Sequence, residues 1–189
     1  MPIPEFDHNH VLPPHIGNPS DGIHLVSPYR ATSIELVDFF ATSKKRIEIL
    51  IGLFSFRAKL TAQGLINGFQ WLDGSFVENI EKQENRSPND LDLITFYFGY
   101  DKNFQDKLVQ NFAEFADRDL GKKNYLLDHF PFDATYSPVN NIEFTRYFVQ
   151  LFSHNRNKVW KGMIRIELNT TDQDNEALEK LKKLQENDK

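Results

Sequence analysis

The sequence of 189 residues contains no cysteine. Disulfide bonds, zinc sites built on thiolates and cysteine nucleophiles are therefore excluded, and the composition fits a reducing compartment. The longest apolar stretch, around residues 47–56, is far too short to span a bilayer. The first residues also lack the basic and apolar regions of a signal peptide. We therefore expect a cytoplasmic protein with no membrane partner.

The chain also has no excess of basic residues over acidic ones. The chain has 22 lysines and arginines against 27 acidic residues, a formal net charge of −5. Whole-molecule charge therefore does not support binding to RNA or DNA, although a local basic patch could still contact RNA. We interpret the basic run Lys44, Lys45 and Arg46 as a solvated helix start rather than such a patch.

What the sequence does have is a regular pattern of apolar residues, including 17 phenylalanines that we assign mostly to the core. The length suits one domain, and no internal repeat is visible. Apolar periodicity predicts the order α-α-β-β-α-β-α-β-α, which favours an α+β fold with a mixed β-sheet flanked by helices. The predicted helices are 33–40, 44–63, 103–119, 141–155 and 171–189, and the predicted strands are 65–74, 91–98, 124–132 and 159–168.

Composition divides the chain into three segments. Residues 1–30 are rich in proline and should form an extended arm packed on the domain, with Phe6, Val11 and Leu12 as anchors. Residues 31–170 form the domain itself. Residues 171–189 form a charged C-terminal helix or tail, with acids first and lysines later as the helix dipole prefers. Its apolar seam is short, so this segment either frays or docks on a partner.

Two aspartates open one of the predicted strands, in the stretch SPNDLDLITFYF. Because side chains two apart on a strand project to the same side, Asp90 and Asp92 would repel each other unless a cation lies between them. The preceding strand ends in WLDGSF, where Gly74 and Ser75 could offer backbone N–H groups and a hydroxyl to a phosphate. Mg²⁺ takes both carboxylate and phosphate oxygens. The pattern predicts a site for a metal ion and a phosphate.

This combination resembles the nucleotidyltransferase superfamily that includes the β-type DNA polymerases, in which Gly-Ser after an apolar residue precedes an acid-x-acid pair between apolar residues. The matching residues are Leu72, Gly74, Ser75, Asp90, Leu91, Asp92 and Leu93. More narrowly, the chain is similar to a poorly characterised bacterial nucleotidyltransferase-like family. The pieces that carry this narrower resemblance are Pro4-Glu5-Phe6, Leu12-Pro13-Pro14, Gly74–Val77, Pro88–Leu93 and Arg156 with Lys161-Gly162-Met163.

The resemblance implies a nucleotidyltransferase-like mixed sheet and a metal-dependent enzyme. Such an enzyme transfers a nucleoside monophosphate from a nucleoside triphosphate to an acceptor hydroxyl on a protein, an RNA end or a small molecule. Asp90 and Asp92 would bind Mg²⁺ or Mn²⁺, and Gly74 and Ser75 would hold the β- and γ-phosphates. A third carboxylate from a neighbouring strand is expected as base or shared ligand. Asp128 is the first candidate and Asp133 the alternative.

Two assignments stay open at this stage. Lys161 is expected to contact the triphosphate or, alternatively, to be a surface lysine. The spacer between the turn and the acids is longer and more polar than the superfamily pattern. This departure favours an alternative function, a catalytically inactive interaction protein on the same fold. It would be antitoxin-like or nucleotide-sensing, with a partner protein encoded nearby in a bacterial defence or toxin–antitoxin system.

Overall fold

A computed structural model describes residues 3–187, so the outermost residues of the predicted arm (1–2) and tail (188–189) lie outside it. One sheet has the strand order β1-β5-β2-β3-β4. β2 is antiparallel to β3 and β5, whereas β3 pairs with β4, and β1 with β5, in parallel. The predicted α+β fold with a mixed sheet is confirmed. The strands are β1 (Tyr29–Arg30), β2 (Gly68–Asp73), β3 (Leu91–Tyr97), β4 (Leu127–Asp133) and β5 (Ile164–Glu167).

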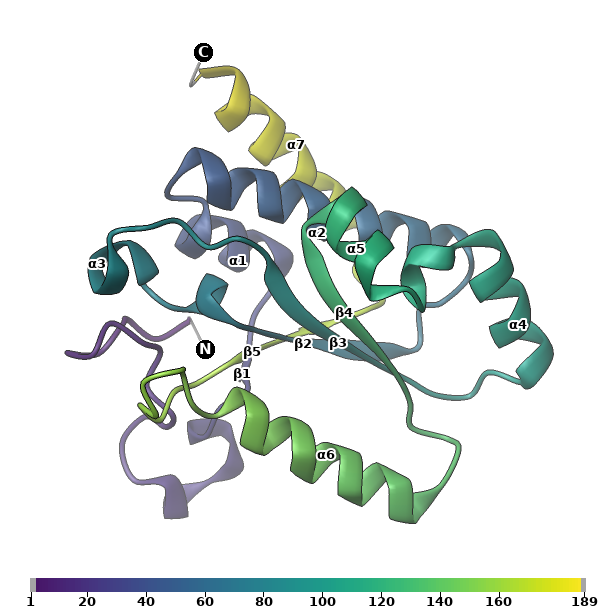
Figure 1. Cartoon of the computed structure of the whole chain (residues 1–189), viewed down its shortest axis with the longest axis horizontal. Helices are drawn as coiled ribbons and strands as arrows, with labels where there is room; N and C mark the ends of the chain where they lie inside the picture. The colour runs from purple at the N-terminus through teal and green to yellow at the C-terminus, as the bar shows by residue number, and fades with distance from the viewer. Residues whose placement is uncertain (1–2, 188–189) are drawn as a thin grey trace.

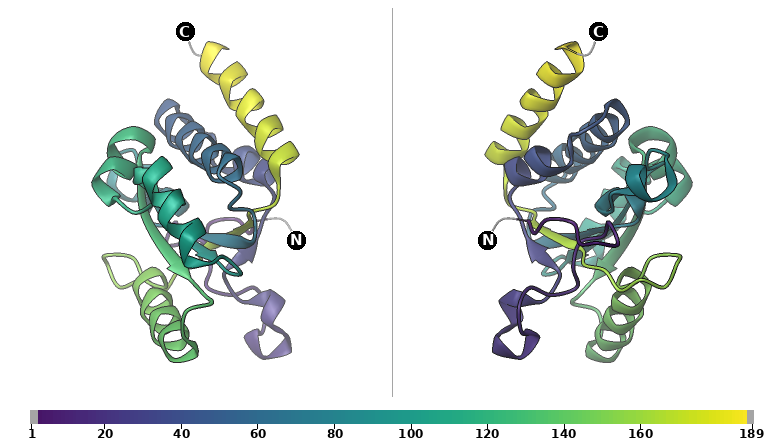
Figure 2. Two further views of the ribbon diagram at one scale, coloured as in Figure 1. Left: turned by 90° about the vertical axis from the view of Figure 1, so that its right-hand side faces the viewer. Right: turned by 90° about the vertical axis from the view of Figure 1, so that its left-hand side faces the viewer.

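Helices cover the two faces of the sheet unequally. α1, α2, α5 and α7 lie over one face and α6 lies over the other (Figure 1), and the side views show the same layers (Figure 2). None of the helices within residues 3–187 combines the length and the apolar character that crossing a membrane requires. The helices are α1 (Ser33–Phe40), α2 (Lys44–Ala62), α3 (Ile80–Glu84), α4 (Lys102–Asn111), α5 (Arg118–Tyr125), α6 (Pro138–Phe152) and α7 (Thr171–Asn187), with 3-10 turns η1 (Pro19–Asp21), η2 (Ile23–Leu25), η3 (Ser75–Val77) and η4 (Ala113–Phe115).

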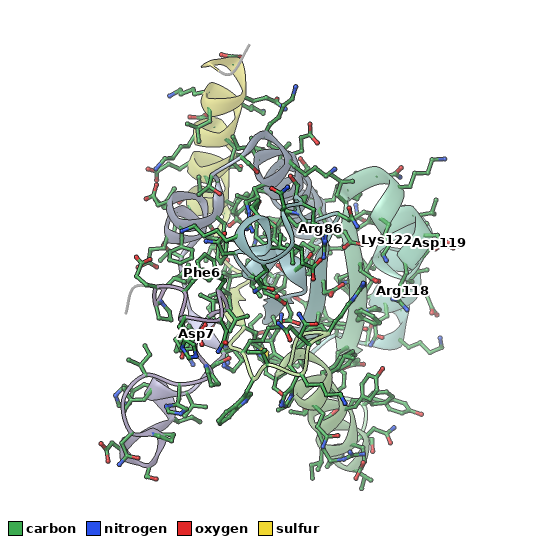
Figure 3. The ribbon with its side chains drawn as sticks, turned by 60° about the vertical axis from the view of Figure 1, so that its left-hand side comes forward. Phe6, Asp7, Arg86, Arg118, Asp119 and Lys122 are labelled. Carbon is green, nitrogen blue, oxygen red and sulfur yellow. The ribbon has the colours of Figure 1, made fainter. Side chains whose placement is uncertain are left out.

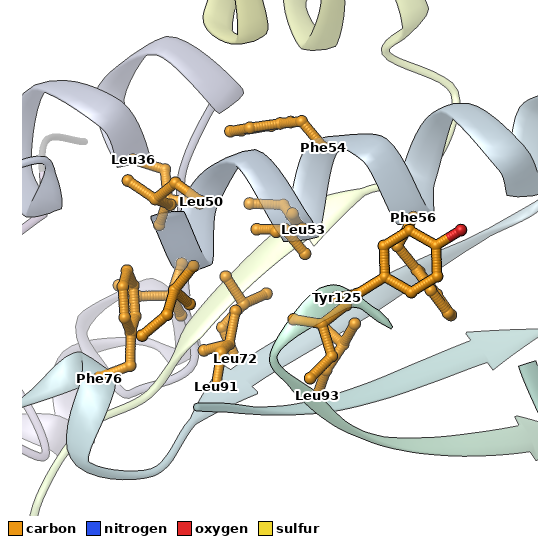
Figure 4. Packing of buried hydrophobic residues seen from close by; sticks show 14 of the residues in the cluster. Leu36, Leu50, Leu53, Phe54, Phe56, Leu72, Phe76, Leu91, Leu93 and Tyr125 are labelled. Atoms are coloured by element: carbon orange, nitrogen blue, oxygen red, sulfur yellow. The ribbon is translucent and has the colours of Figure 1, made fainter. Parts of the chain in front are cut away.

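Each face of the sheet has its own hydrophobic cluster. Leu91 and Leu93 of β3 belong to the larger cluster, which lies between α2 and the sheet (Figure 4). Ile94 and Phe96 of the same strand belong to the smaller cluster, together with Phe148 of α6. Successive side chains of a strand point to opposite faces. The side chain of Asp92 therefore projects to the face that α6 covers.

The first two predicted helices are confirmed, and their N-caps explain where they begin. The Thr32 hydroxyl accepts a hydrogen bond from the Glu35 N–H, and the Glu35 carboxylate accepts one from the Thr32 N–H, which completes a capping box. The Ser43 hydroxyl accepts from the Arg46 N–H at the start of α2. Capping separates α1 from α2 at the predicted position.

Arg46 corrects the prediction of a solvated basic start for α2, because this residue is buried. Its guanidinium donates to the carbonyl oxygens of Phe76 and Glu78 and pairs with the carboxylate of Glu81 at 2.8 Å. These partners lie in η3, in α3 and in the link between them. Arg46 therefore ties the segment after the Gly74-Ser75 turn to α2.

The predicted single helix at 103–119 is wrong. The segment forms α4, η4 and α5 instead, because Asp101 and Asp117 each cap a separate helix by accepting backbone N–H groups. Gly121 lies inside α5. A Cβ at Gly121 would approach the Leu127 carbonyl oxygen to 3.1 Å, so glycine lets α5 pack closely on β4.

The N-terminal arm is packed on the domain. Val11 and Leu12 are buried, and the ring of Phe6 contacts Phe39 and Phe40 of α1 at centroid distances of 5.2 and 6.3 Å. The arm thus contributes apolar side chains to the core, although it contains little regular structure.

The charged C-terminal segment is a helix that docks on the domain itself. Ala177 and Leu181 are buried, and α7 packs on α1 and α2. At its first turn, Asp174 accepts from the buried Arg57 of α2 at 2.8 Å. The short apolar seam therefore already has a partner within the chain.

Candidate functional site

Three neighbouring strands bring acidic residues to one end of the sheet. Asp92 of β3 pairs directly with Asp73 at the end of β2 and with Asp128 near the start of β4. Residues directly opposite each other on paired strands carry their side chains on the same face. Asp90, two positions before Asp92, projects to that face as well. The structure therefore gathers Asp90, Asp92 and Asp128 as predicted, and Asp73 lies beside them.

The Gly74-Ser75 turn follows β2 directly and passes beside Asp92. Gly74 has φ 79° and ψ −166°, a conformation that is essentially restricted to glycine. A Cβ at Gly74 would lie 2.6 Å from Oδ2 of Asp92, so the absent side chain leaves room for this carboxylate. Ser75 opens η3. The predicted turn and the predicted acids are thus neighbours in space.

Lys161 supports this turn from the interior. Its ammonium group is buried, lies 2.9 Å from Oδ1 of Asp73 and 3.0 Å from Glu78, and donates to the carbonyl oxygen of Gly74 at 3.0 Å. Burial raises the pKa of Asp73 to about 7, although Lys161 acts in the opposite direction. The expectation of a surface lysine is wrong. Lys161 fixes the position of the turn by binding three of its oxygen atoms.

Asp92 lies at the centre of the acidic group. Burial, followed by the charges of Asp90 and Asp128, raises the pKa of Asp92 to about 6, while Lys161 and Lys122 lower it. Two other carboxylates therefore surround this side chain at a partly dry position. A further cation among the three carboxylates would offset their repulsion and stabilise their ionised forms.

Asp128 is the member of the acidic group that already has two basic partners. Arg118 of α5 donates to both of its oxygens, at 2.7 and 2.8 Å, and Lys122 lies 2.8 Å from Oδ2. Lys122 also lies 3.3 Å from Asp90. Burial tends to raise the pKa of Asp128, but the hydrogen bonds from Arg118 and Lys122 outweigh it and hold that pKa below its usual value.

Asp133 and His129, on the same strand as Asp128, lie outside this acidic group. Asp133, the alternative third carboxylate, pairs with Tyr97 at the far end of β4, where it accepts from Gln105. His129 points to the face opposite Asp128, as strand alternation predicts. It is buried there between the Phe115 carbonyl oxygen and the Thr95 hydroxyl, and burial lowers its pKa to about 3.

A cavity of about 510 Å³ opens in front of these acids. Its wall combines the Gly74-Ser75 turn with residues from α5, the end of α6 and the loop that follows α6. Arginine and lysine side chains line the cavity together with the carboxylates, and Arg86, Arg118 and Lys122 lie on the same side of the molecule (Figure 3). The basic residues that line the cavity, which we call its basic wall, are Arg86, Arg118, Lys122, Arg156 and Lys161. The cavity therefore presents both carboxylates and basic side chains to a ligand.

Sequence reasoning missed the role of α5. Arg118 and Lys122 are one helical turn apart and precede the strand that carries Asp128, a spacing that places both on one side of a helix. The signal was hidden because Arg118 fell at the end of a predicted helix that the structure divides. Within residues 3–187, no group of three histidine, aspartate or glutamate side chains is arranged as it stands to hold a metal ion. The ammonium group of Lys122 lies between Asp90 and Asp128, and Arg118 holds Asp128.

Comparison with known proteins identifies one family. A family of unknown function, DUF6932, matches residues 4–167, which includes the arm, the sheet and every residue of the site described above. No curated protein gives a significant match. No solved structure does either.

Proposed function

The chain belongs to the family of unknown function DUF6932, and we propose that it is a cytoplasmic, metal-dependent nucleotidyltransferase. It would transfer a nucleoside monophosphate from a nucleoside triphosphate to an acceptor hydroxyl. One observation carries the proposal, namely the register that sets Asp92 directly opposite Asp128 and beside the Gly74-Ser75 turn. The basic wall of the same cavity supplies the charge that a triphosphate requires.

The acidic group fits a hard divalent cation. Mg²⁺ and Mn²⁺ prefer carboxylate oxygens, and Asp90, Asp92 and Asp128 would hold the ion. The ammonium group of Lys122 already lies within 3.3 Å of both Asp90 and Asp128, so this position accepts positive charge. The raised pKa of Asp92 supports the same conclusion. When bound, the ion would neutralise charge on the phosphates.

The triphosphate would lie between the turn and the basic wall. Gly74 and Ser75 would offer backbone N–H groups and a hydroxyl to the β- and γ-phosphates, and Arg86 and Arg156 line the same cavity. Lys161 would act on the phosphates through the turn, because its ammonium group is already held by Asp73, Glu78 and Gly74.

The transfer itself exchanges one bond for another. The acceptor oxygen forms a bond to the α-phosphorus, the bond from that phosphorus to the oxygen bridging to the β-phosphate breaks, and pyrophosphate leaves. The hydroxyl proton would pass to a carboxylate oxygen of Asp128. Because Arg118 and Lys122 keep the pKa of Asp128 low, Asp128 becomes an effective base after these two cations have moved away from it.

Isothermal titration of Mg²⁺–nucleoside triphosphates tests the site. Wild type should bind at least one of the four common nucleotides, and Asp92→Asn and Asp90→Asn should bind it at least tenfold more weakly. Asp119→Asn is the matched control, because Asp119 is an exposed acid of α5 that lies outside the cavity. Equal binding by wild type and the Asp92 variant would reject this site.

A second candidate function is a non-catalytic interaction protein, and the surface of α6 favours it. Apart from the buried Phe148 and Phe152, this helix exposes many of its apolar side chains, including Val139 and Ile142 at 69% and 68%. Incubation with labelled nucleoside triphosphates and the product of a neighbouring gene separates the two candidates. Transfer of label supports the enzyme, whereas stable association without transfer supports the interaction protein.

A further inference from the structure

Two basic residues of α5 already stand inside the acidic group. Arg118 and Lys122, the α5 cation pair, lie one helical turn apart. Arg118 holds Asp128 with two parallel hydrogen bonds of 2.7 and 2.8 Å. Lys122 lies 2.8 Å from Asp128 and 3.3 Å from Asp90, so its ammonium group bridges two carboxylates. Its charge therefore occupies the place that the proposed function assigns to a divalent ion.

We propose that the α5 cation pair is an exchangeable counter-ion. In the metal-free protein it neutralises Asp90 and Asp128, and it moves onto the triphosphate when a metal ion and a nucleotide bind together. This inference rests on the proposed function and specifies its substrate. The protein takes up a metal–nucleoside triphosphate complex, and the metal ion alone binds weakly.

The geometry lets the charged ends move while the helix stays in place. The side chains of Arg118 and Lys122 are 53% and 44% exposed, whereas α5 is anchored by its Asp117 cap and by the buried ring of Tyr125. The Arg118 guanidinium lies 4.2 Å from the ring centroid of Phe130, which lines the same cavity. Long basic side chains rotate about their stems and keep their apolar part in contact with such a surface.

Whether Arg118 and Lys122 leave the carboxylates depends on which other anions are present. The arginine fork binds carboxylate or phosphate oxygens with the same pair of hydrogen bonds. A metal ion that arrives alone must compete with two cations for Asp90 and Asp128, and it leaves those cations without an anionic partner. A triphosphate that arrives with the ion provides that partner. Metal and nucleotide therefore raise each other's affinity by one common factor.

Mn²⁺ binding tests this inference without any measurement of activity. Free Mn²⁺ is measured by electron paramagnetic resonance in wild type and in Lys122→Gln, with and without a non-hydrolysable nucleoside triphosphate. Coupling between sites is commonly about 5- to 150-fold. We expect Lys122→Gln to bind Mn²⁺ alone about tenfold more tightly than wild type, and the Mn²⁺–nucleotide complex about tenfold more weakly. Arg118→Gln should change both affinities in the same directions.

Lys123→Gln is the matched control. It removes the same charge from the next residue of α5, where Lys123 is exposed and outside the cavity, and both affinities should stay as in wild type. The inference is overturned if Lys122→Gln and Arg118→Gln bind Mn²⁺ alone no better than Lys123→Gln. The proposed function fails by a different comparison, if wild type binds Mn²⁺ no better with nucleotide than without it. Circular dichroism confirms that each variant is folded.

Discussion

At the scale of single residues, Gly74 is a position where the site tolerates no side chain. We expect Gly74→Ala to lower the free energy of unfolding by about 2–4 kcal/mol, because its φ of 79° and ψ of −166° strain any other residue and the new Cβ would crowd Asp92. Displacement of Asp92 should also abolish nucleotide binding. Urea denaturation and isothermal titration measure the two effects.

Gly17 provides the control for this substitution. It also has a positive φ, 62°, but a Cβ there would meet no atom within 4 Å. Gly17→Ala should therefore cost only the backbone strain, about 1 kcal/mol. If the two variants lose equal stability, the close approach of Asp92 to the turn has no energetic consequence.

Site residues could be predicted from the sequence where the residues that form the pattern are close together in the chain. Asp90 and Asp92 are two positions apart, and Gly74 with Ser75 directly follows a strand, so strand alternation and turn chemistry sufficed to identify them. Lys161 could not be placed, because its partners Asp73 and Glu78 come from a distant part of the sequence. A lysine with no acidic partner nearby in the sequence is normally assigned to the surface, and only tertiary packing shows that Lys161 is buried.

At the scale of secondary-structure elements, the contact between α7 and α2 includes one buried ion pair. Asp174 accepts from Arg57 at 2.8 Å, and Arg57 is 1% exposed. We expect Asp174→Ala to lower the free energy of unfolding by about 3–5 kcal/mol, because it leaves a buried guanidinium without its carboxylate. Chemical denaturation followed by circular dichroism measures the loss.

Asp172→Ala is the control in the same helical turn. Asp172 is exposed, so its removal loses only a favourable interaction with the helix dipole, about 0.3–1 kcal/mol. A comparable loss from both variants would show that the charge at the start of α7 matters, and that the pairing with Arg57 does not.

Element boundaries were predictable only where local chemistry sets them. Thr32 and Ser43 cap α1 and α2 as their sequences indicate. The apolar stripe through 103–119 concealed the break between α4 and α5, because Phe112 and Phe115 lie within the break and are still buried. Pro131 lies inside β4, which continues to Asp133. An edge strand tolerates a missing N–H group. Whether a strand lies at the edge depends on the order of strands in the sheet, which the local sequence does not indicate.

At the scale of the whole molecule, Tyr29 connects the proline-rich segment to the sheet, because it lies in β1, which pairs with β5, and its hydroxyl donates to the Pro13 carbonyl oxygen at 2.7 Å. Burial raises the pKa of Tyr29 to about 12, whereas an unfolded tyrosine ionises near pH 10. The stabilisation from this phenol is therefore complete below pH 10 and is lost as the pH rises toward 12. Between pH 9 and 11, we expect its contribution to the free energy of unfolding to fall by about 1 kcal/mol.

Tyr29→Phe isolates that contribution from every other titrating group. At pH 9 the variant should be about 1 kcal/mol less stable than wild type because the hydrogen bond is gone. At pH 11 the two proteins should have nearly equal stability in urea denaturation. A difference that stays constant across this range would mean that Tyr29 ionises in the folded arm as easily as in the unfolded chain.

The class of the fold was predictable because the type of each element follows from its periodicity, and the order of strands was not. β5, the last strand in the sequence, lies between β1 and β2. Its place depends on contacts that no local pattern encodes. The same holds for the cavity, whose wall combines β2, β3, β4, α5 and the loop after α6. Asp90, Asp92 and Asp128 could be listed from the sequence, but the α5 cations that contact Asp90 and Asp128 could not.

Because distant segments build the cavity, a ligand there should stabilise the whole fold. A ligand at about 100 times its Kd adds about 2.7 kcal/mol to the folded state. In a chain of this size that raises Tm by about 5–10 °C. We expect this shift with Mg²⁺ and nucleotide together, a much smaller shift with either alone, and none in Asp92→Asn. An equal shift from nucleotide without metal would place the ligand on the basic wall, away from the acids, and would remove the reason to assign them a catalytic role.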